Sequence, residues 1–486
     1  MPFSAHNLIL LSDVHLGSDL VHHAQPDAPS RLRSSERRNR DLAALLDWYR
    51  THPHAGRPWR LVIAGDFIDF AGMSVPYELA TETAPNEEEK LNGLGNARGH
   101  SLAKLRLVME HDSVVIRGLA RFLEAGNSLV IVRGNHDVDW HWEAVQEEFR
   151  RGLAVHALVA ADQVEFAPWF YYEEGVVFVE HGHQYDAYCS YEHVLHPVSP
   201  SDPRRTVRSL SEILLRYVVR PTRGMSEAGH GAAVLSDYLR FAFGLGIGGM
   251  LGLARRFLSA TRALLALWRE HLSEAAHRVK REHEARLEHL SRRHRIQLER
   301  LIDLARLWRP PVTRSVFTLL PAVMLDRVLL AALGVVLVAS FALLVQDPIT
   351  VSLLVAGTVI TLIGVGAIWR RMRDAIEPSA QLRERSALVA RLFPAAFVVM
   401  GHTHLPETGP AAKETTYVNL GAWAEEDAPD GRVPLLPATR THLVLACAEE
   451  GPIAELMTWD GDGPRPFTEA GGEQKSRFLE LFRKAS

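Results

Sequence analysis

Cysteine is scarce in this chain, and no long apolar run opens it. Only Cys189 and Cys447 occur among 486 residues, so the sequence holds no disulfide framework and does not require an oxidising compartment. Near the N-terminus only Leu8–Leu11 is uniformly apolar, no basic stretch precedes it, and Ser12 and Asp13 follow at once. This pattern lacks the parts of a signal peptide and indicates a first buried strand instead.

An excess of charge of one sign is also missing. The formal net charge is −4, with 47% hydrophobic and 23% charged residues, which is ordinary for a globular protein. This balance favours neither a nucleic-acid-binding protein nor a disordered one. The charges are unevenly spread, however, because arginine crowds 204–327 whereas 328–369 contains one charged residue, Asp347. The length allows two or three domains.

Short apolar runs, each followed by a polar cluster, recur along the chain. Runs of four or five residues rich in Val, Ile and Leu fit buried strands better than helices. Helical stretches such as Asp41–Arg50 and Leu102–Glu124 lie between them. The alternation predicts an α/β fold whose chemistry lies at the strand ends. The runs are Asn7–Leu11, Leu61–Ala64, Leu129–Val132, Val176–Val179 and Phe397–Met400.

The polar residues at these strand ends are of the types that bind a pair of divalent metals. Two such ions about 3.5–4 Å apart can activate a water and stabilise the oxyanions of displacement at phosphorus. The pair needs imidazoles, a bridging carboxylate and a terminal carboxylate. Taken singly, each of these histidines is more often a core or loop residue than a ligand, but their joint placement favours a site. The candidates are Asp13, His15, Asp66, Asn135, His136, His181, His402 and His404.

Five motifs in order make the chain resemble the calcineurin-like metallophosphoesterases. The resemblance covers about 7–190 and 397–423. It implies a four-layer αββα sandwich, interrupted here by an all-α insertion. The motifs are Asp13-Val14-His15, Gly65-Asp66-Phe67-Ile68-Asp69, Gly134-Asn135-His136-Asp137, His181-Gly182-His183 and Gly401-His402-Thr403-His404.

The resemblance also implies a role for each matching residue. Asp66 would bridge the two metals, and a metal-bound hydroxide would be the nucleophile. Asp13, His15 and His404 would hold the first metal, and Asn135, His181 and His402 the second. Ligands of nitrogen and oxygen without thiolate favour manganese, with iron or zinc as alternatives.

His136 is expected to lie over the leaving-group oxygen. It would act there as a proton donor or stabilise the charge of the transition state, and Asp137 would orient it. Asp69 and His183 are expected outside the direct ligands, as supporting or substrate-contacting residues.

The sequence from 205 to 391 departs from the pattern and is predicted to be a helical insertion. Its highly charged part, Trp268–Arg309, would be roughly 60 Å long as one helix. A coiled coil and a solvated helical hairpin are both open for it, and the hairpin is favoured because the heptad is imperfect. Phe241–Ala254 fits an interfacial or buried helix.

Two uncharged segments, Val328–Val345 and Ile349–Trp369, approach the roughly twenty residues that cross a bilayer. Arg327 and Arg370 flank the outer ends, so both ends and the catalytic domain would lie on the cytoplasmic side. The alternative is a pair of helices buried in a large core. The predicted domains are thus 1–204 and 392–460 for the two parts of the catalytic domain, 205–391 for the insertion with its transmembrane hairpin, and 461–486 for a tail.

Within the family, Ser12–Gly17 and the motifs at Asp66 and His402 resemble the branch of the UDP-diacylglucosamine pyrophosphatases. The chain departs from that branch at His136, where arginine is usual, and through its insertion. We therefore expect a membrane-anchored hydrolase of a phosphoester or pyrophosphate substrate that is lipid-linked. A tethered phosphodiesterase or phosphatase for a soluble nucleotide-like substrate and a non-enzymatic membrane scaffold are the alternatives. Basic residues do not cluster around the motifs, which argues against nucleic acid, and the sequence leaves the oligomeric state open.

Overall fold

The computed structural model describes residues 6–21, 28–222, 244–323, 325–372, 378–424, 439–448 and 451–468. Most of the predicted tail, from 469 onward, and residues 241–243 of the predicted interfacial helix lie outside the described residues. By compactness the chain divides into two units. The first comprises 1–230, 270–311 and 378–486, and the second comprises 231–269 and 312–377.

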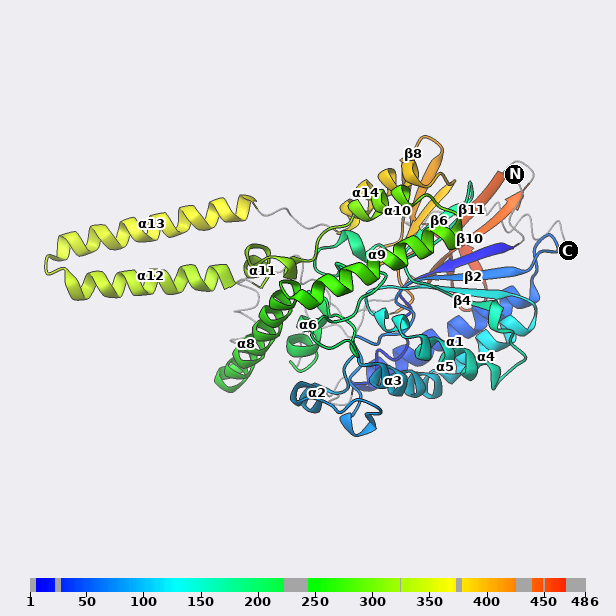
Figure 1. Ribbon diagram of the computed structural model, residues 1–486, viewed down its shortest axis with the longest axis horizontal. Helices are drawn as coiled ribbons and strands as arrows, with labels where there is room; N and C mark the ends of the chain where they lie inside the picture. Colours follow the sequence, from blue (N-terminus) through cyan, green and yellow to red (C-terminus); the bar gives the residue numbers. More distant parts are fainter. Residues whose placement is uncertain are drawn as a thin grey trace. The chain divides into compact units, whose positions relative to one another are not determined.

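Two β-sheets form the centre of the first unit (Figure 1), which confirms the α/β prediction. In the larger sheet β1, β2, β3 and β4 are parallel neighbours, and β10 pairs antiparallel with β1. In the smaller sheet β6, β7 and β9 are parallel, with β5 and β8 antiparallel at the two edges. All five predicted runs are strands. The larger sheet has the order β12 (Pro464–Pro466), β11 (Gly451–Trp459), β10 (Thr441–Ala448), β1 (Asn7–Leu11), β2 (Trp59–Ala64), β3 (Ser128–Val132), β4 (Val164–Ala167). The smaller has the order β5 (Phe170–Glu173), β6 (Val177–Glu180), β7 (Phe397–Met400), β9 (Thr415–Asn419), β8 (Glu407–Ala412).

Alternating side chains of each central strand go to different hydrophobic clusters. In β1, Leu8 and Leu10 pack between the two sheets, whereas Ile9 and Leu11 face a helical layer. Phe178 of β6 likewise faces away from the other sheet, toward a second helical layer. The order of layers in this unit is therefore helix, sheet, sheet, helix.

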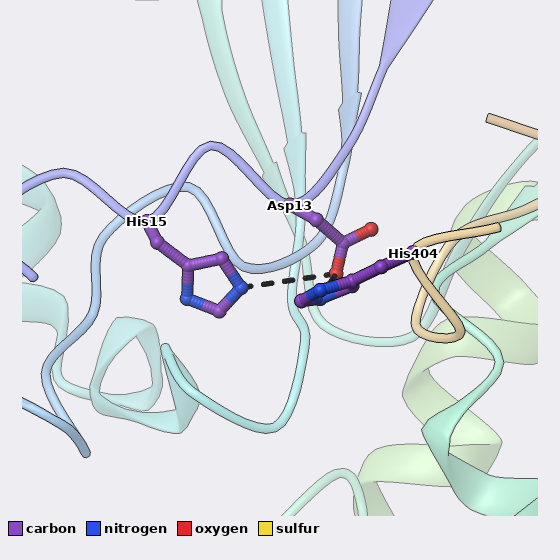
Figure 2. Close-up of side chains that lie close together, drawn as sticks. All are labelled: Asp13, His15 and His404. Atoms are coloured by element: carbon purple, nitrogen blue, oxygen red, sulfur yellow. Dashed lines mark ion pairs between the residues drawn. The ribbon is translucent and has the colours of Figure 1, made fainter. Parts of the chain in front are cut away.

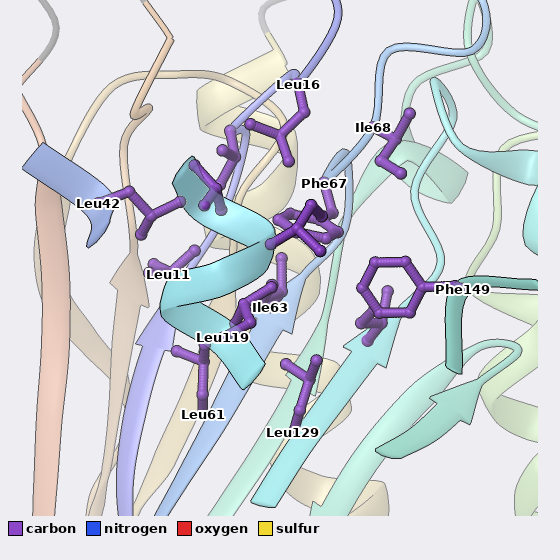
Figure 3. Packing of buried hydrophobic residues seen from close by; sticks show 14 of the residues in the cluster. Leu11, Leu16, Leu42, Leu61, Ile63, Phe67, Ile68, Leu119, Leu129 and Phe149 are labelled. Atoms are coloured by element: carbon purple, nitrogen blue, oxygen red, sulfur yellow. The ribbon is translucent and has the colours of Figure 1, made fainter. Parts of the chain in front are cut away.

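The outer face of the larger sheet is covered by four helices, whose apolar side chains interlock with those of β1, β2 and β3 (Figure 3). Phe67 and Ile68, which follow β2, are fully buried in this layer, so the loop carrying Asp66 is fixed by packing on its own neighbours. The helices are α1 (Ala28–Thr51), α3 (Arg98–His111), α4 (Ser113–Glu124) and α5 (Glu143–Ala154).

The outer face of the smaller sheet is covered by α9 (Glu274–His294), α10 (Leu298–Arg306) and α14 (Pro378–Leu392). The charged segment is thus neither one long helix nor a solvated hairpin. Leu287 and Leu290 of α9 are buried in the core of this layer, and Ser273 caps the start of the helix. Arg295, in the left-handed region at φ 56°, ends it. The charged residues that dominate the sequence occupy the other faces of α9, where they are exposed.

The first part of the predicted insertion packs on the catalytic domain as well. The helical turns α6 (Leu210–Leu214) and η5 (Leu215–Val219), with the residues just before them, are held to α2 (Glu87–Asn92) by partly buried ion pairs. Arg216 Nε lies 2.5 Å from Glu88 Oε1, and Arg208 Nη1 lies 3.1 Å from Glu88 Oε2. The domain boundaries drawn from the sequence stay a prediction.

The second unit contains α8 (Gly246–His271) up to Arg269, α11 (Val316–Ala322), α12 (Leu325–Leu344) and α13 (Pro348–Met372). The helices α12 and α13 run antiparallel beside each other (Figure 1). Both are long and apolar enough to cross a membrane, and their most apolar stretches are not buried.

Candidate metal centre

The predicted ligands lie in loops at the carboxyl ends of β1, β2, β3, β6 and β7. Because these strands are parallel within each sheet, their ends meet at one edge. The sequence predicted the site at these strand ends. In the structure, residues from both sheets contact one another at this edge.

Backbone strain is concentrated in these loops. Nine described non-glycine residues have positive φ, and five of them are predicted ligands. Such conformations cost free energy and persist only where the surrounding structure enforces them, so they favour a functional role for these loops. The five are Asp13 (53°), His15 (51°), Asp66 (52°), His402 (71°) and His404 (59°).

At position 134, in the third motif, the structure requires glycine. A Cβ at this position would lie 2.1 Å from Asp66 Oδ1 and 2.6 Å from the Asp66 backbone nitrogen. Any side chain would therefore displace the carboxylate from the centre of the site.

The first group of potential ligands comprises Asp13, His15 and His404, whose side chains converge in Figure 2. His404 Nε2 lies 3.0 Å from Asp13 Oδ1. His15 Nε2 is buried and makes no hydrogen bond, but it lies 3.9 Å from Asp13 Oδ1 and 3.8 Å from Asp66 Oδ2. A buried imidazole nitrogen beside two carboxylates, too far for hydrogen bonds, is a position that a cation would satisfy.

The second group comprises Asp13, Asp66 and His181, with Asn135 beside them. His181 Nδ1 lies 2.8 Å from the carbonyl oxygen of Ala64, to which it must donate. The other ring nitrogen, Nε2, then faces Asn135 Oδ1 at 3.0 Å and Asp66 Oδ2 at 3.2 Å. Three acceptors facing one another require a proton or a metal ion between them.

The electrostatics of His181 agree with this geometry. Burial alone would lower the pKa of His181, but the carboxylates of Asp66 and Asp13 raise it to about 9. A metal ion bound at Nε2 would take the place of that proton. The residues present therefore fit a divalent metal. Asp66 is placed between His15 and His181, as a bridging carboxylate must be.

His402 lies beside His181, with ring centroids 5.3 Å apart. Its Nε2 is 3.2 Å from Asp186 Oδ2, and its backbone nitrogen donates to Asp13 Oδ2 at 3.1 Å. Asp186, Cys189 and His402 form a further group that could hold a metal ion. No feature of the sequence pointed to Cys189, whereas Asp186 follows the fourth motif closely in the chain and could be expected near the site.

His136 reaches the site from the loop after β3, but the residue that holds it differs from the prediction. His136 Nδ1 lies 2.7 Å from Asp69 Oδ1, so Asp69 orients the ring. Burial opposes ionisation of Asp69, but the neighbouring His136 holds the pKa of Asp69 well below its usual value.

Asp137, which was predicted to orient His136, serves its own loop. Its carboxylate accepts from the backbone nitrogens of Gly134 at 2.6 Å and Phe67 at 2.8 Å, and from Trp140 Nε1 at 3.1 Å. Although His136 and Asp137 are adjacent in the chain, their side chains thus bind different partners.

His183 is buried with its Nε2 at 2.9 Å from Gln184 Nε2, and it belongs to none of the potential ligand groups among the described residues. Burial, together with His181 and His402, holds its pKa well below the usual value. This neutral imidazole lies against the ligands, with its ring centroid 5.4 Å from that of His181.

Comparison with known proteins bears on the first part of the domain. The family model of calcineurin-like phosphoesterases matches residues 6–222. The match therefore includes α6 and η5 and ends before β7, with His402 and His404 beyond it. A search of the curated proteins finds no match. The family binds divalent metals at a dinuclear site and hydrolyses phosphoesters. With residues 6–222 matching calcineurin-like phosphoesterases and ligand groups at the strand ends, the chain is a metal-dependent hydrolase.

Proposed function

We propose that the protein is a membrane-anchored phosphohydrolase that cleaves a phosphoester or pyrophosphate bond at a dinuclear metal site. In this proposal Asp66 bridges the two metals. The remaining ligands are Asp13, His15 and His404 for one metal and Asn135, His181 and His402 for the other. Manganese is the favoured metal, with iron or zinc as alternatives.

One observation carries the proposal. The carboxylate of Asp66 lies between two imidazole nitrogens, His15 Nε2 at 3.8 Å and His181 Nε2 at 3.2 Å. His15 Nε2 makes no hydrogen bond. In His181 the ring proton is on Nδ1, which donates to Ala64, so Nε2 of the neutral ring has a lone pair. Both nitrogens can therefore bind a metal. Metals on the two sides of one carboxylate give the arrangement that displacement at phosphorus requires.

The bound metals would activate a water and neutralise the charge on the phosphoryl oxygens. Protonation of the leaving group is assigned to His136. Its Nδ1–H donates to Asp69, and in the imidazolium form its Nε2–H would donate a proton to the leaving-group oxygen, which leaves the ring neutral. The His136 side chain is 20% exposed, whereas those of Asp66 and His181 are at most 1% exposed, so a substrate can reach His136.

Membrane anchoring rests on α12 and α13. Their apolar side chains are exposed, for example Val335 and Ile360, at 69% and 70%. Arginines stand near the outer ends, at Arg327 and Arg370, so both ends would lie on the cytoplasmic side. An anchored site favours a lipid-linked phosphoester or pyrophosphate, as in the branch that the motifs resemble. A soluble nucleotide-like substrate is the competing assignment. A scaffold without activity is disfavoured because every ligand type is present.

The test is hydrolysis of bis-p-nitrophenyl phosphate by the full chain purified in detergent, with manganese or with a chelator. We expect metal-dependent hydrolysis that is lost in Asp66→Asn, together with loss of bound metal. Asp162→Asn, at an exposed carboxylate away from the ligand groups, is the matched control. Wild-type turnover in a folded Asp66→Asn protein would overturn the bridge. Lipid-linked pyrophosphates in mixed micelles, compared with nucleotides, then decide between the two substrate classes.

A further inference from the structure

Asp69 makes contacts on two sides, and only one of them serves His136. Its Oδ1 accepts from His136 Nδ1 at 2.7 Å and from the backbone nitrogen of Gly72 at 2.8 Å. Its Oδ2 lies 3.4 Å from Nη2 of Arg220. The side chains of Asp69 and Arg220 are 2% and 10% exposed, so this ion pair is formed away from bulk water.

The position of Arg220 is set by η5, which is bound to its surroundings by several contacts. Arg220 directly follows η5, in which Arg216 donates to the Leu94 carbonyl oxygen at 3.0 Å and pairs with Glu88 at 2.5 Å. These contacts fix the backbone from which the Arg220 guanidinium reaches Asp69. Arg216 and Arg220 are four residues apart, yet only Arg220 is in reach of the Asp69 carboxylate among the described contacts.

The backbone at Gly72 lies directly against the ion pair. A Cβ on Gly72 would lie 2.2 Å from Asp69 Oδ2 and 2.7 Å from Arg220 Nη2. The only competing imidazole beside Asp69 is that of His15, whose Nδ1 is 4.0 Å from Oδ1 among the described ion pairs. Both imidazoles thus face Oδ1, with His136 much the closer, whereas Arg220 contacts the other oxygen, Oδ2.

We infer that Arg220 is a positioning residue for His136, acting through Asp69. By pairing with Oδ2 it fixes the Asp69 carboxylate, which in turn fixes the His136 ring with Nδ1 protonated and Nε2 facing the reacting group. The inference rests on the proposed function, because it assigns His136 the task of protonating the leaving group. A residue that supports a catalytic group in this way is typically worth ~10–100-fold in rate.

The experiment compares two substrates with the full chain and manganese, one with a p-nitrophenolate leaving group and one with an alkoxide. p-Nitrophenolate leaves without a proton, whereas an alkoxide needs one. We expect Arg220→Met to lower kcat by ~10–100-fold for the alkyl ester, with little change for the p-nitrophenyl ester and in KM. Arg220→Lys should recover part of the loss, since it keeps a cation beside Asp69.

Arg216→Met is the matched control, because it removes a buried arginine from the same element without touching Asp69. It should lower the thermal midpoint and affect both substrates alike. If Arg220→Met and Arg220→Lys also lower both rates by the same factor, Arg220 is structural and the inference is overturned.

A second readout does not depend on turnover. In protein labelled with ¹⁵N-histidine, the imidazole signals that vanish in His136→Gln belong to His136. At a pH at which the ring is neutral, the wild type should show Nδ1 protonated and Nε2 unprotonated, and Arg220→Met should show a mixture of the two tautomers. The proton that is given to the leaving group is the one that Nε2 then gains in the imidazolium. An unchanged His136 signal in Arg220→Met would overturn the inference. Absence of any metal-dependent hydrolysis by the wild type would instead overturn the proposed function, and the tautomer result would still stand.

Discussion

At the scale of single residues, the site depends on which nitrogen of each imidazole donates a hydrogen bond to a fixed acceptor. His181 donates through Nδ1 to the carbonyl of Ala64 and His136 through Nδ1 to Asp69, so both present Nε2 to the centre. The partners differ, however. His181 faces a buried carboxylate and an amide oxygen, whereas His136 is partly exposed. In the proposed function, histidine thus serves as a metal ligand in one case and contacts the substrate in the other.

This difference predicts the effect of replacing His136. In His136→Gln, turnover of an alkyl phosphodiester should fall by ~10²–10⁴-fold because the proton donor is lost. The content of bound manganese should be unchanged, since the ligand groups are intact. Steady-state kinetics and elemental analysis of the same sample check this. A variant that loses its metal along with its activity would make His136 a ligand instead.

The residue that orients His136 could not be found from the sequence. Asp137 stands next to it in the chain, whereas Asp69 lies 67 positions away and meets it only after β2 and β3 pair. That the candidate ligands would come together was predictable because each follows an apolar run, and the ends of parallel strands meet at one edge of a sheet. Arg220 carries no sequence signal, since its distance to Asp69 depends on how η5 is held.

At the scale of elements, α9 shows how a highly charged segment is used as part of a core. Its buried positions are Val279, His283, Leu287 and Leu290, which recur every three or four residues and form one stripe. His283 Nδ1 accepts from the backbone nitrogen of Leu195 at 3.2 Å, so the docked helix requires a neutral imidazole there. The buried face of α9 could not be recognised from the sequence because charged residues dominate the other faces of the helix.

The docking of α9 should therefore weaken in acid. Burial, with the neighbouring His193, His196 and Arg133, lowers the pKa of His283 from 6.5 to about 4. The unfolded state then binds the proton first, so the contribution of His283 to stability is present above about pH 6.5 and is lost as the pH falls toward 4. At most roughly 3 kcal/mol is involved, at 1.36 kcal/mol for each pKa unit.

Hydrogen–deuterium exchange of α9, corrected for the intrinsic effect of pH, measures this dependence. Protection should fall between pH 7 and pH 5 in the wild type and depend less on pH in His283→Phe. His289, which is exposed on the same helix, provides the control in His289→Phe. Equal pH dependence in the wild type and His283→Phe would exclude His283 as the responsible group.

At the scale of the whole molecule, two compact units are built from interleaved pieces of the chain. The unit with the metal centre contains both β1 and β10, which pair antiparallel although 430 residues separate Leu11 from Thr441. The unit with α12 and α13 comes from between them. Removing that unit should therefore leave the sheets intact.

Replacing 325–372 by a short Gly-Ser linker tests this separation. Because α12 and α13 form an antiparallel hairpin, their outer ends are adjacent and can be joined. The shortened protein should no longer fractionate with membranes but should still hydrolyse bis-p-nitrophenyl phosphate. A shortened protein that remains in the membrane fraction would show that another segment is the principal anchor.

The pairing of β1 with β10 has a consequence for the order of events during synthesis. His402, His404 and β10 all follow α12 and α13 in the chain, so they leave the ribosome only after the apolar hairpin has emerged. Until then the larger sheet has an open edge at β1, and the potential ligand groups that contain His402 or His404 are incomplete. An enzyme anchored by this hairpin would thus acquire its activity only after it had reached its membrane, and nascent chains would be inert while in transit.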